Sequence, residues 1–417
     1  MNRTKINIGL FGFGCVGFGL YEVLQKTPSF KANIKRICVK NKHKKRPINA
    51  EYFTFDKFEI LNDQEINTIV ELIDDAEEAF EIVKLALQNG KAVVTANKKM
   101  IAEHFDELLA LQKKFNVPVL YEAACCASIP IIRNLEEYYD NDLLESIEGI
   151  VNGSTNYILT KTASEDISYQ KALADAQQKG YAESKPILDT SGLDAKYKLL
   201  ILIAHAFGVV LKPEDIFNIG IDKLGELEFN YAKEKKLKIK LIAHAEKTDD
   251  GKLKAFVMPK FISESDNFFY VDGVFNGIKT KTFFSDLQFF SGKGAGAYPT
   301  ASAVLSDISA LSYNYQYEYK KIHKTEVLAK TDDVILKVFL RHDLPSSFEL
   351  RHYFEVVNES YLNQDSGFII GNISLENMKK LSLDDALVTS FVLIEIVNSK
   401  WENRKFDVIN ESGKAVK

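Results

Sequence analysis

The sequence predicts an α/β protein in which a doubly wound parallel sheet is followed by an α+β domain and a C-terminal module with a ferredoxin-like order of elements. Three observations lead to this prediction. A glycine-rich turn follows the first apolar strand, strands then alternate with helical segments as far as Glu122, and the residues after 319 read β-α-β-β-α-β. Strands separated by helices are typical of parallel sheets with helices on both faces. At 417 residues, we expect more than one domain.

The glycine-rich turn has the pattern G-x-G-x-x-G, between a predicted strand at residues 5–11 and a helix that ends near Lys26. Its residues are Gly12, Phe13, Gly14, Cys15, Val16 and Gly17. In a Rossmann domain the first glycine permits the tight turn, the second lets a pyrophosphate approach the backbone, and the third lets helix and strand pack closely. The phosphates then rest on free N–H groups at the start of the helix. A turn without a ligand is the alternative, but the strand–turn–helix context predicts that these residues bind a dinucleotide.

A basic run follows the second predicted strand, at residues 34–40. NAD enzymes often place an acid here for the ribose 2′-hydroxyl, but residues 40–46 read KNKHKKR. This favours NADP over NAD, with Lys40 nearest the adenosine ribose. A solvated basic loop is the alternative for the other lysines.

The alternation continues with strands at 68–73, 91–95 and 117–122 and helices at 77–88 and 99–115. Ligands on doubly wound sheets bind beyond the carboxyl ends of the strands. We therefore expect Thr95, Lys98 and Glu122 at the site.

Residues 180–198 carry several charged side chains directly before the apolar stretch LLILIAHAF. They include Glu183, Lys185, Asp189, Asp194 and Lys198, and Pro186 and Gly192 interrupt any helix among them. Asp194 and Lys198 are four apart and share a helical face, so a surface ion pair is one interpretation. An all-apolar helix is usually buried. The group therefore favours a site for a small substrate with an amine and a carbonyl or hydroxyl.

The middle of the chain predicts strands at 237–247, 252–262, 271–283 and 284–290. The phenylalanine pairs at 283–284 and 289–290 form either a subunit interface or a plain core. A glycine run, residues 292–296, precedes a helix at 300–311 that we expect to pack back on the first sheet. Residues 152–156 read as a loop before a helix, where Ser154 and Thr155 either bind a substrate carboxylate or cap the helix.

The C-terminal part begins after the tyrosine-rich residues 313–319, which read as a linker. Strands are predicted at 334–341, 356–362, 367–373 and 388–397, with helices at 346–355 and 375–381. This order is ferredoxin-like.

Composition excludes several classes of protein. A net charge of −5 gives no reason to expect nucleic-acid binding. Four cysteines are too few and too unevenly spaced for a disulfide framework or zinc site, which fits a cytoplasmic protein. The apolar N-terminal stretch contains five glycines and no cleavage site, so we expect no signal peptide. No apolar run reaches the length of about 20 residues that spans a bilayer.

Taken together, these motifs resemble homoserine dehydrogenase. The matches occur in order over residues 5–310: GFGCVG, VVTANK, YEA, NGSTNYIL, GYAES, DTSGLDAKYK, VDGVFNGI and GKGAGAYPTASAV. The resemblance implies NAD(P)-dependent interconversion of L-homoserine and L-aspartate 4-semialdehyde, in threonine, methionine and isoleucine biosynthesis. It also implies a homodimer or homotetramer joined through β-sheet.

The resemblance further implies roles for individual residues. Lys198 transfers a proton, as an acid when the aldehyde is reduced, and Asp194 orients it; Lys98 lies between cofactor and substrate. Substrate binding falls to Glu183, Asp189, Asp194, Thr155 and Gly180, and cofactor binding extends to Thr95, Lys98, Gly294 and Gly296. For the glycine run a flexible hairpin end is the alternative. A monovalent cation, Na⁺, is implied at Glu122 with the backbone carbonyls of Cys125, Ala127 and Ile129.

The implied domains are a dinucleotide-binding domain at 1–142 completed by 295–312, a substrate-binding and dimerisation domain at 143–294, and an ACT-like module at 320–417. That module either binds an effector or is a structural appendage.

Three departures from the family pattern stand out. Cys125-Cys126-Ala127-Ser128 replaces a glycine-containing turn, Asp74-Asp75 replaces two glycines, and Lys185 stands where an acid is frequent. The alternatives to an active enzyme of this family are an inactive NADP-binding regulatory protein and another two-domain NAD(P) oxidoreductase.

Overall fold

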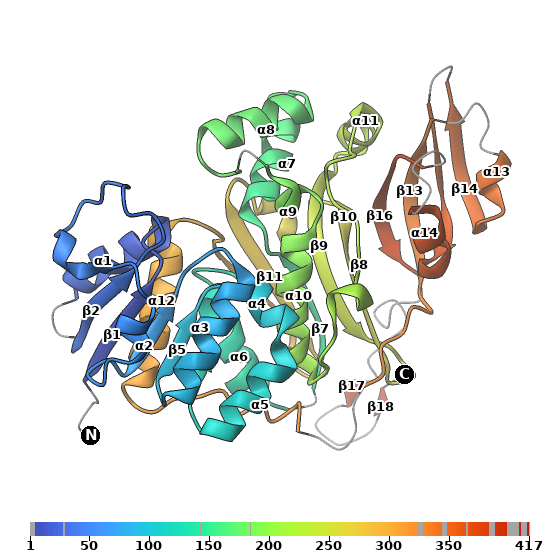
Figure 1. Ribbon diagram of the computed structural model, residues 1–417. Helices are drawn as coiled ribbons and strands as arrows, with labels where there is room; N and C mark the ends of the chain where they lie inside the picture. Colours follow the sequence, from blue (N-terminus) through green and yellow to red (C-terminus); the bar gives the residue numbers. More distant parts are fainter. Residues whose placement is uncertain are drawn as a thin grey trace. The chain divides into compact units, whose positions relative to one another are not determined.

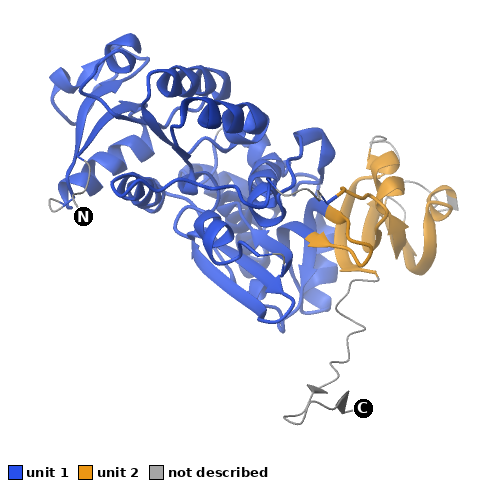
Figure 2. Cartoon of the chain, turned by 90° about the horizontal axis from the view of Figure 1, so that it is seen from below, with its two compact units in different colours: residues 1–245, 255–328 blue, residues 246–254, 329–417 orange. Residues whose placement is uncertain are grey.

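A computed structural model of the protein describes residues 5–27, 30–141, 143–183, 185–323, 328–343, 348–363, 366–382, 388–397, 408–409 and 415–416. Its helices and strands fall into two compact units, residues 1–245 with 255–328 and residues 246–254 with 329–417 (Figure 2). Among the described residues, no helix has both the length and the apolar character needed to cross a membrane.

The first sheet has six parallel strands in the order β3-β2-β1-β4-β5-β6. They are β1 (Ile6–Phe11), β2 (Ala32–Cys38), β3 (Phe53–Thr54), β4 (Thr68–Glu71), β5 (Ala92–Thr95) and β6 (Val119–Leu120). The helices are α1 (Cys15–Gln25), α2 (Phe58–Leu61), α3 (Ala76–Gln88), α4 (Lys98–Glu103) and α5 (Phe105–Phe115). From β1 the chain continues to β2 on one side of the sheet, and from β4 it continues to β5 on the other side. Because both crossover connections are right-handed, α1 and α3 lie on opposite faces of the sheet (Figure 1). This confirms the doubly wound sheet.

Two predicted elements of this sheet differ from the structure. The helix predicted at 99–115 is broken at His104, whose ring stacks 3.9 Å from that of Phe80 and whose nitrogens meet Glu77 and Glu107. The strand predicted at 117–122 ends at Leu120, because the chain turns into a 3₁₀ helix at Glu122–Ala124.

The second sheet of the first unit has the order β12-β11-β7-β9-β10, and β8 pairs with β10. Its strands are β7 (Leu144–Ile150), β8 (Phe217–Asn218), β9 (Lys238–Lys247), β10 (Leu253–Ile262), β11 (Phe275–Thr282) and β12 (Asp286–Lys293). The accompanying helices are α6 (Ile131–Glu137), α7 (Gly153–Glu165), α8 (Tyr169–Gln178), α9 (Ile187–Thr190), α10 (Leu193–Phe207) and α11 (Glu226–Glu234).

The hairpin of β11 and β12 lies later in the sequence than predicted. Thr282 pairs with Asp286, and Asp286 has a φ of 57°, so the three residues between them form the turn. Phe283 and Phe284 therefore lie in the turn and not in a strand, and Phe284 is 78% exposed. A plain core at this pair is excluded.

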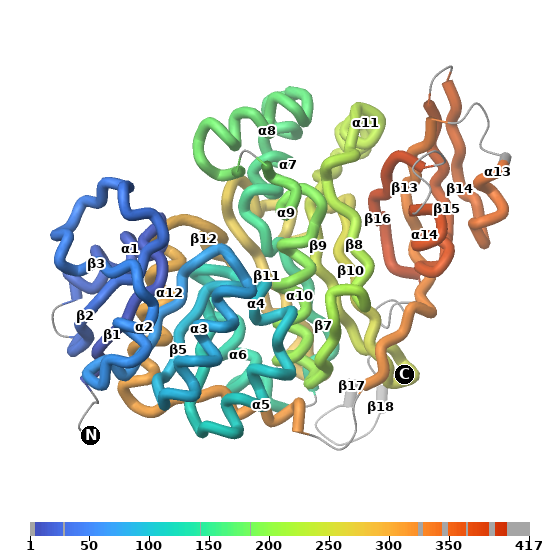
Figure 3. Tube along the Cα trace, viewed as in Figure 1, coloured from blue at the N-terminus to red at the C-terminus, as the bar shows by residue number. Residues whose placement is uncertain are grey.

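Helix α12 (Ala297–Leu311) returns to the first sheet and lies beside α1 (Figure 3). A Cβ at Gly19 of α1 would lie 2.9 Å from the carbonyl oxygen of Ala297, so the two backbones touch. The helix begins three residues before the predicted start because Pro299 falls in its first turn, where no N–H donor is needed.

The tyrosine-rich residues 313–319, predicted as a linker, pack into the first unit instead. Tyr317 and Tyr319 are buried, and the Tyr319 hydroxyl lies 3.1 Å from that of Tyr121. Tyr121 in turn meets Nε2 of His205, at the end of α10. The stretch therefore belongs to the first unit.

The second unit contains an antiparallel sheet in the order β16-β13-β15-β14. Its elements are β13 (Ile335–His342), α13 (Phe348–Arg351), β14 (Phe354–Leu362), β15 (Gly367–Ser374), α14 (Leu375–Ser382) and β16 (Ser390–Ile396), and the short strands β17 (Val408–Ile409) and β18 (Ala415–Val416) pair near the end of the chain. The β-α-β-β-α-β order matches the sequence prediction. The helix predicted at 346–355 starts outside the described residues and ends at Arg351, because Phe354 already pairs with Ile373. An ACT-like role stays a prediction.

Candidate active site

Two lysines and one aspartate form the centre of the candidate site. Nζ of Lys198 lies 2.6 Å from Oδ2 of Asp194, and Nζ of Lys98 lies 3.0 Å from Oδ1 of the same carboxylate. Lys98 is the first residue of α4, one of the helices of the first sheet, and Asp194 and Lys198 lie on the first two turns of α10. The Asp194–Lys198 pair is therefore not a surface ion pair, since both side chains are at most 10% exposed.

The break before α10 places these residues. Gly192 has a φ of 81°, which favours glycine, and the short helix α9 ends just before it. Behind the polar first turn, Leu199 to Ala204 are buried, which confirms the predicted buried helix. Asp194 thus enters a nearly dry region where the free N–H groups of a helix start favour a negative charge.

Asn152 joins the two acids of the site. Its Nδ2 donates to Oδ1 of Asp189 at 2.8 Å and to Oδ2 of Asp194 at 2.7 Å. The preceding carbonyl, of Val151, accepts a hydrogen bond from Lys198 at 2.7 Å. Asn152 is the first residue of the motif NGSTNYIL, and no role is predicted for it from sequence.

The charged side chains of the site shift one another's pKa values. Burial alone would raise the pKa of Asp194, but Lys198 and Lys98 outweigh it and hold that pKa well below its usual range. Asp194 raises the pKa of Lys98, against the effect of burial. Burial and Asp194 raise the pKa of Asp189. The two lysines therefore favour the ionised form of Asp194, whereas Asp189 takes up a proton more readily.

The glycine turn after β1 has the shape that phosphate binding needs. Gly12 has a φ of 90°, and a Cβ there would lie 2.4 Å from the carbonyl oxygen of Leu72. A Cβ at Gly17 would lie 2.5 Å from the Gly12 carbonyl oxygen, whereas nothing lies within 4 Å of a Cβ at Gly14. The middle glycine therefore faces open space at the start of α1, where Cys15 and Val16 begin the helix.

The edge formed by β4 and β5 contains a buried carboxyl group. The Thr95 hydroxyl donates to Glu71 at 2.5 Å, and the N–H of Ile73 donates to the other Glu71 oxygen. Burial raises the pKa of Glu71 to about 7. Thr95 is fully buried, and its hydroxyl is used by Glu71.

Asp75, one of the two acids in place of glycines, caps α3. Its carboxylate accepts the N–H of Glu78 at 3.0 Å. This contact gives Asp75 a structural role as a helix cap.

The loop implied as a cation site keeps its turn without glycine. Ala127 has a φ of 47°, the left-handed conformation that glycine adopts most easily. The two oxygens of Glu122 accept N–H groups of Ile132 and Arg133 at the start of α6, while the Ile129 carbonyl accepts the N–H of Ile131. Burial and nearby Asp307 raise the pKa of Glu122 to about 8, against the opposing effect of Arg133, which pairs with Asp307 at 2.8 Å.

The remaining predicted site residues lie on several different elements. Glu183 is exposed near the end of α8, and Gly180 has a φ of 72° in the same turn. Lys40 is exposed after β2. Gly294 lies against the side chain of Asn276, since a Cβ there would be 2.0 Å from its Oδ1, and Gly296 is the N-cap of α12. Ser184 lies outside the described residues.

Residues 152–156 are helical apart from the first. Asn152 is the N-cap of α7, with its Oδ1 accepting the N–H of Thr155 at 2.8 Å. Ser154 donates to the Tyr181 carbonyl, and the Thr155 hydroxyl donates to that of Asn152. The expected loop and the expected capping by Ser154 or Thr155 are therefore wrong, because the amide of Asn152 takes that role.

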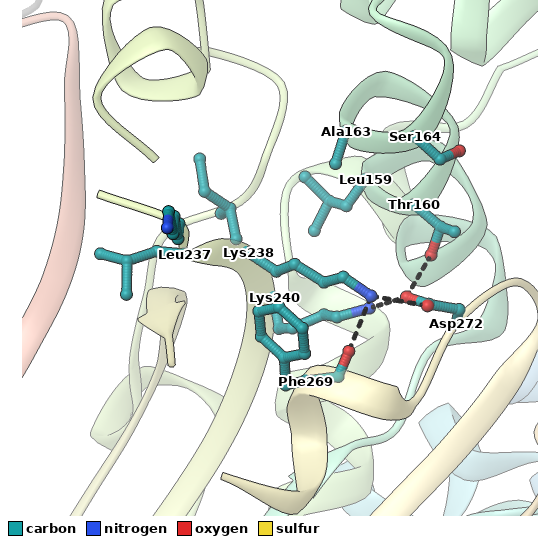
Figure 4. Close-up of a pocket in the computed structure, with 11 residues that line it drawn as sticks. Leu159, Thr160, Ala163, Ser164, Leu237, Lys238, Lys240, Phe269 and Asp272 are labelled. Atoms are coloured by element: carbon teal, nitrogen blue, oxygen red, sulfur yellow. Dashed lines mark hydrogen bonds and ion pairs between the residues drawn. The ribbon is translucent and has the colours of Figure 1, made fainter. Parts of the chain in front are cut away.

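A second polar cluster lies in a pocket of about 240 Å³ beside α7 (Figure 4). Lys238 and Lys240 both bind the carboxylate of Asp272, at 2.7 and 2.9 Å. Lys240 also donates to Asn156 and to the Val271 carbonyl. These contacts hold the loop before β11 against α7, and none of the predicted site residues lines this pocket.

Comparison with known proteins gives one family. Residues 12–122 match the family model for the NAD-binding domain of homoserine dehydrogenase, and residues 130–309 match that for homoserine dehydrogenase. The homoserine dehydrogenase of Lactococcus lactis is 32% identical over 92% of this chain and 89% of its own length, and that of Helicobacter pylori is 38% identical over 73% of each.

Solved structures agree. The homoserine dehydrogenase of Thiobacillus denitrificans superposes with a TM-score of 0.80 at 29% identity, covering 94% of this chain and 98% of that one. A hyperthermophilic archaeal homoserine dehydrogenase mutant in complex with NADPH has a TM-score of 0.65 at 29% identity, over 76% of this chain and 100% of that one.

Proposed function

The chain belongs to the homoserine dehydrogenase family, and on that premise we propose how its own residues carry out the reaction. The enzyme interconverts L-homoserine and L-aspartate 4-semialdehyde with a nicotinamide cofactor, a step in the synthesis of threonine, methionine and isoleucine. One observation carries the proposal. Two ammonium groups, from α4 and α10, meet the two oxygens of one buried carboxylate, that of Asp194.

In the reductive direction Lys198 acts as the general acid. The bound cofactor supplies the hydride that reaches the aldehyde carbon. Lys198 gives a proton to the oxygen as its negative charge develops, and the neutral amine then recovers a proton from water. Asp194 fixes the direction of the ammonium group through the contact at 2.6 Å. Lys98, which is 41% exposed, lies closer to solvent and stabilises the oxygen electrostatically.

Asp189 and Glu183 bind the ammonium group of the substrate. Asp189 has one oxygen bound by Asn152, which leaves the other free for a ligand among its described contacts. The exposed Glu183 closes on the substrate from the turn at Gly180. The substrate carboxylate would bind at the N-terminus of α7, whose first turn contains Thr155.

The turn from Gly12 to Gly17 would hold the phosphates of the cofactor. Thr95, Lys98 and the run that contains Gly294 and Gly296 would hold its nicotinamide, which supplies the hydride. NADP is preferred over NAD, because the basic loop after β2 begins with the exposed Lys40 and contains no acid. An NADPH complex of a solved relative supports this choice.

A monovalent cation, Na⁺, binds Glu122 together with the carbonyl oxygens of Cys125, Ala127 and Ile129. Each Glu122 oxygen accepts one N–H and retains a second lone pair for a cation. The cation would hold the turn next to α6. Replacing NaCl by choline chloride should then lower the melting temperature of wild type but not that of Glu122→Gln.

The protein forms a homodimer or a tetramer built from it in the cytoplasm. Exposed apolar side chains on the β11–β12 hairpin support a subunit contact there: Phe283, Phe284 and Leu287. All four cysteines are free thiols, which suits a reducing compartment. Sedimentation of wild type and of a Phe284→Ser variant measures the contribution of this hairpin.

The function is tested by following absorbance while the protein is incubated with aspartate semialdehyde and either NADPH or NADH. We expect oxidation of both cofactors, faster with NADPH at low concentration. Cofactor binding without turnover would instead indicate an inactive regulatory protein. Turnover of other aldehydes but not of this one would indicate a different oxidoreductase.

A further inference from the structure

Asn152 has a fixed orientation that the geometry of α7 determines. Its Oδ1 must face the N–H of Thr155, because that group is a donor and lies 2.8 Å away. The NH₂ end therefore faces Asp189 and Asp194, and the alternative amide orientation would set two donors against each other. At 4% exposure the side chain has little room for another arrangement.

An NH₂ group so placed favours ionised acids. It has two hydrogens and accepts nothing, and it forms a stronger hydrogen bond with a carboxylate than with a protonated carboxyl group. Here the two hydrogens go to two different carboxylates, at 2.8 and 2.7 Å. Two carboxylates this close repel each other in a region of low dielectric. The amide offsets that repulsion without adding a charge.

We propose that Asn152 is a positioning residue of the reaction, whose amide keeps Asp189 and Asp194 both ionised and side by side. One acid is then available for the ammonium group of the substrate while the other holds the two lysines. The inference rests on the proposed roles of Asp189, Asp194 and Lys198. Nothing in the reaction requires Asn152 to touch the substrate.

The charged groups around Asp189 show why the amide matters. Asp194 and Lys198 face it from α10 and Lys98 from α4. Burial and Asp194 raise the pKa of Asp189, whereas Asn152 and the lysines lower it. Without the amide, Asp189 would take up a proton at higher pH and lose its charge for the substrate.

The Asn152→Ser variant separates this role from helix capping. Serine is a good N-cap, so the start of α7 should remain intact, but one hydroxyl cannot donate to both acids. We expect a melting temperature close to wild type. We also expect kcat/KM for homoserine oxidation to fall about tenfold or more on the acid side, with the acid limb of its pH profile moved to higher pH.

Two further variants complete the test. Asn152→Asp also caps the helix but adds a third carboxylate. We therefore expect a greater loss in kcat/KM and a shift of the acid limb of the pH profile in the same direction. This variant provides the test if the serine variant fails to fold. Ser168→Ala removes the cap of α8, where Ser168 accepts the N–H of Lys171. That control should lower the melting temperature and leave the pH profile unchanged.

The inference is overturned if Asn152→Ser keeps the wild-type pH profile and a kcat/KM within about twofold. Lys198→Ala distinguishes this failure from that of the proposed function. An inactive Lys198→Ala beside a wild-type-like Asn152→Ser removes the role of Asn152 alone. Normal turnover by Lys198→Ala would remove the proposed acid whatever Asn152 does.

Discussion

The hydroxyl of Tyr197 donates to the carboxylate of Glu103 across 3.1 Å. This hydrogen bond joins α10, which carries Lys198, to the last residue of α4, which begins with Lys98. Tyr197 is largely buried, and burial together with Glu103 raises its pKa to about 12. The two helices that supply the ammonium groups are therefore fixed to each other at a second point.

Replacing Tyr197 by phenylalanine should loosen this attachment and keep the ring. We expect a loss of about 1 kcal/mol in the free energy of unfolding and a kcat several-fold lower, because small displacements of catalytic groups slow the reaction. Thermal unfolding and steady-state kinetics measure the two effects. Tyr270→Phe is the control, since that tyrosine is exposed and its contact with Glu264 is 3.5 Å long. Equal behaviour of both variants would contradict the proposal.

Lys198→Ala should reduce reductase turnover by about 10²–10⁴, the usual contribution of a general acid. NADPH affinity, measured by fluorescence titration, should stay near wild type. Lys196→Ala is the matched control on the same helix, because its ammonium group points to the Ile216 carbonyl at 3.4 Å. Near-normal turnover by Lys198→Ala would remove this lysine from the mechanism.

Glu71 should make stability depend on pH. Its pKa is about 7 in the folded protein and 4.5 for an ordinary glutamate, so folding takes up a proton between these values. Its contribution is fully present below about pH 4.5 and is lost as pH rises through about 7. Glu71→Gln lacks this titration. In urea unfolding, the stability of wild type relative to the variant should fall by about 1–3 kcal/mol over that range.

A flat difference between wild type and Glu71→Gln across that pH range would show that Glu71 is ionised in the folded state. Glu81→Gln, at an exposed helix position, serves as the control and should show no such slope.

Two alanine variants distinguish the structural and binding roles of the glycine turn. Gly12→Ala meets the Leu72 carbonyl and a φ of 90°, so the apoprotein should lose stability. Gly14→Ala meets nothing within 4 Å, so the apoprotein should melt as wild type does while NADPH binds about tenfold or more weakly. Unchanged NADPH affinity of Gly14→Ala would mean that the phosphates lie elsewhere.

Local patterns predicted the parts of the fold that local chemistry decides. The turn at Gly12 and the buried helix after Gly192 depend on neighbours in the sequence, and both were predicted. Strand β7 was missed because its Glu148 breaks the apolar pattern. That carboxylate is satisfied by His244 and Lys260, which lie far along the chain.

The same distinction applies to the site. Lys98, Asp194 and Lys198 lie together as predicted, but the role of Asn152 depends on acids 37 and 42 residues later. Asp75 was noted only as an acid in place of a glycine, although an acid three residues before a glutamate is also a capping signal. Sequence spacing alone could not choose between these interpretations.

Helix α12 follows the second sheet in sequence yet packs against α1. The cofactor half, meaning the first sheet with its helices, is therefore completed by a helix that is synthesised late. A ribosome that has translated only as far as β6 has produced all six strands of the first sheet but leaves the flank of α1 uncovered. Domains generally fold as units during synthesis. The second sheet and its helices must therefore be synthesised before the first sheet can finish folding. The folding of the nucleotide site thus depends on a segment made after α10, the helix that carries Lys198.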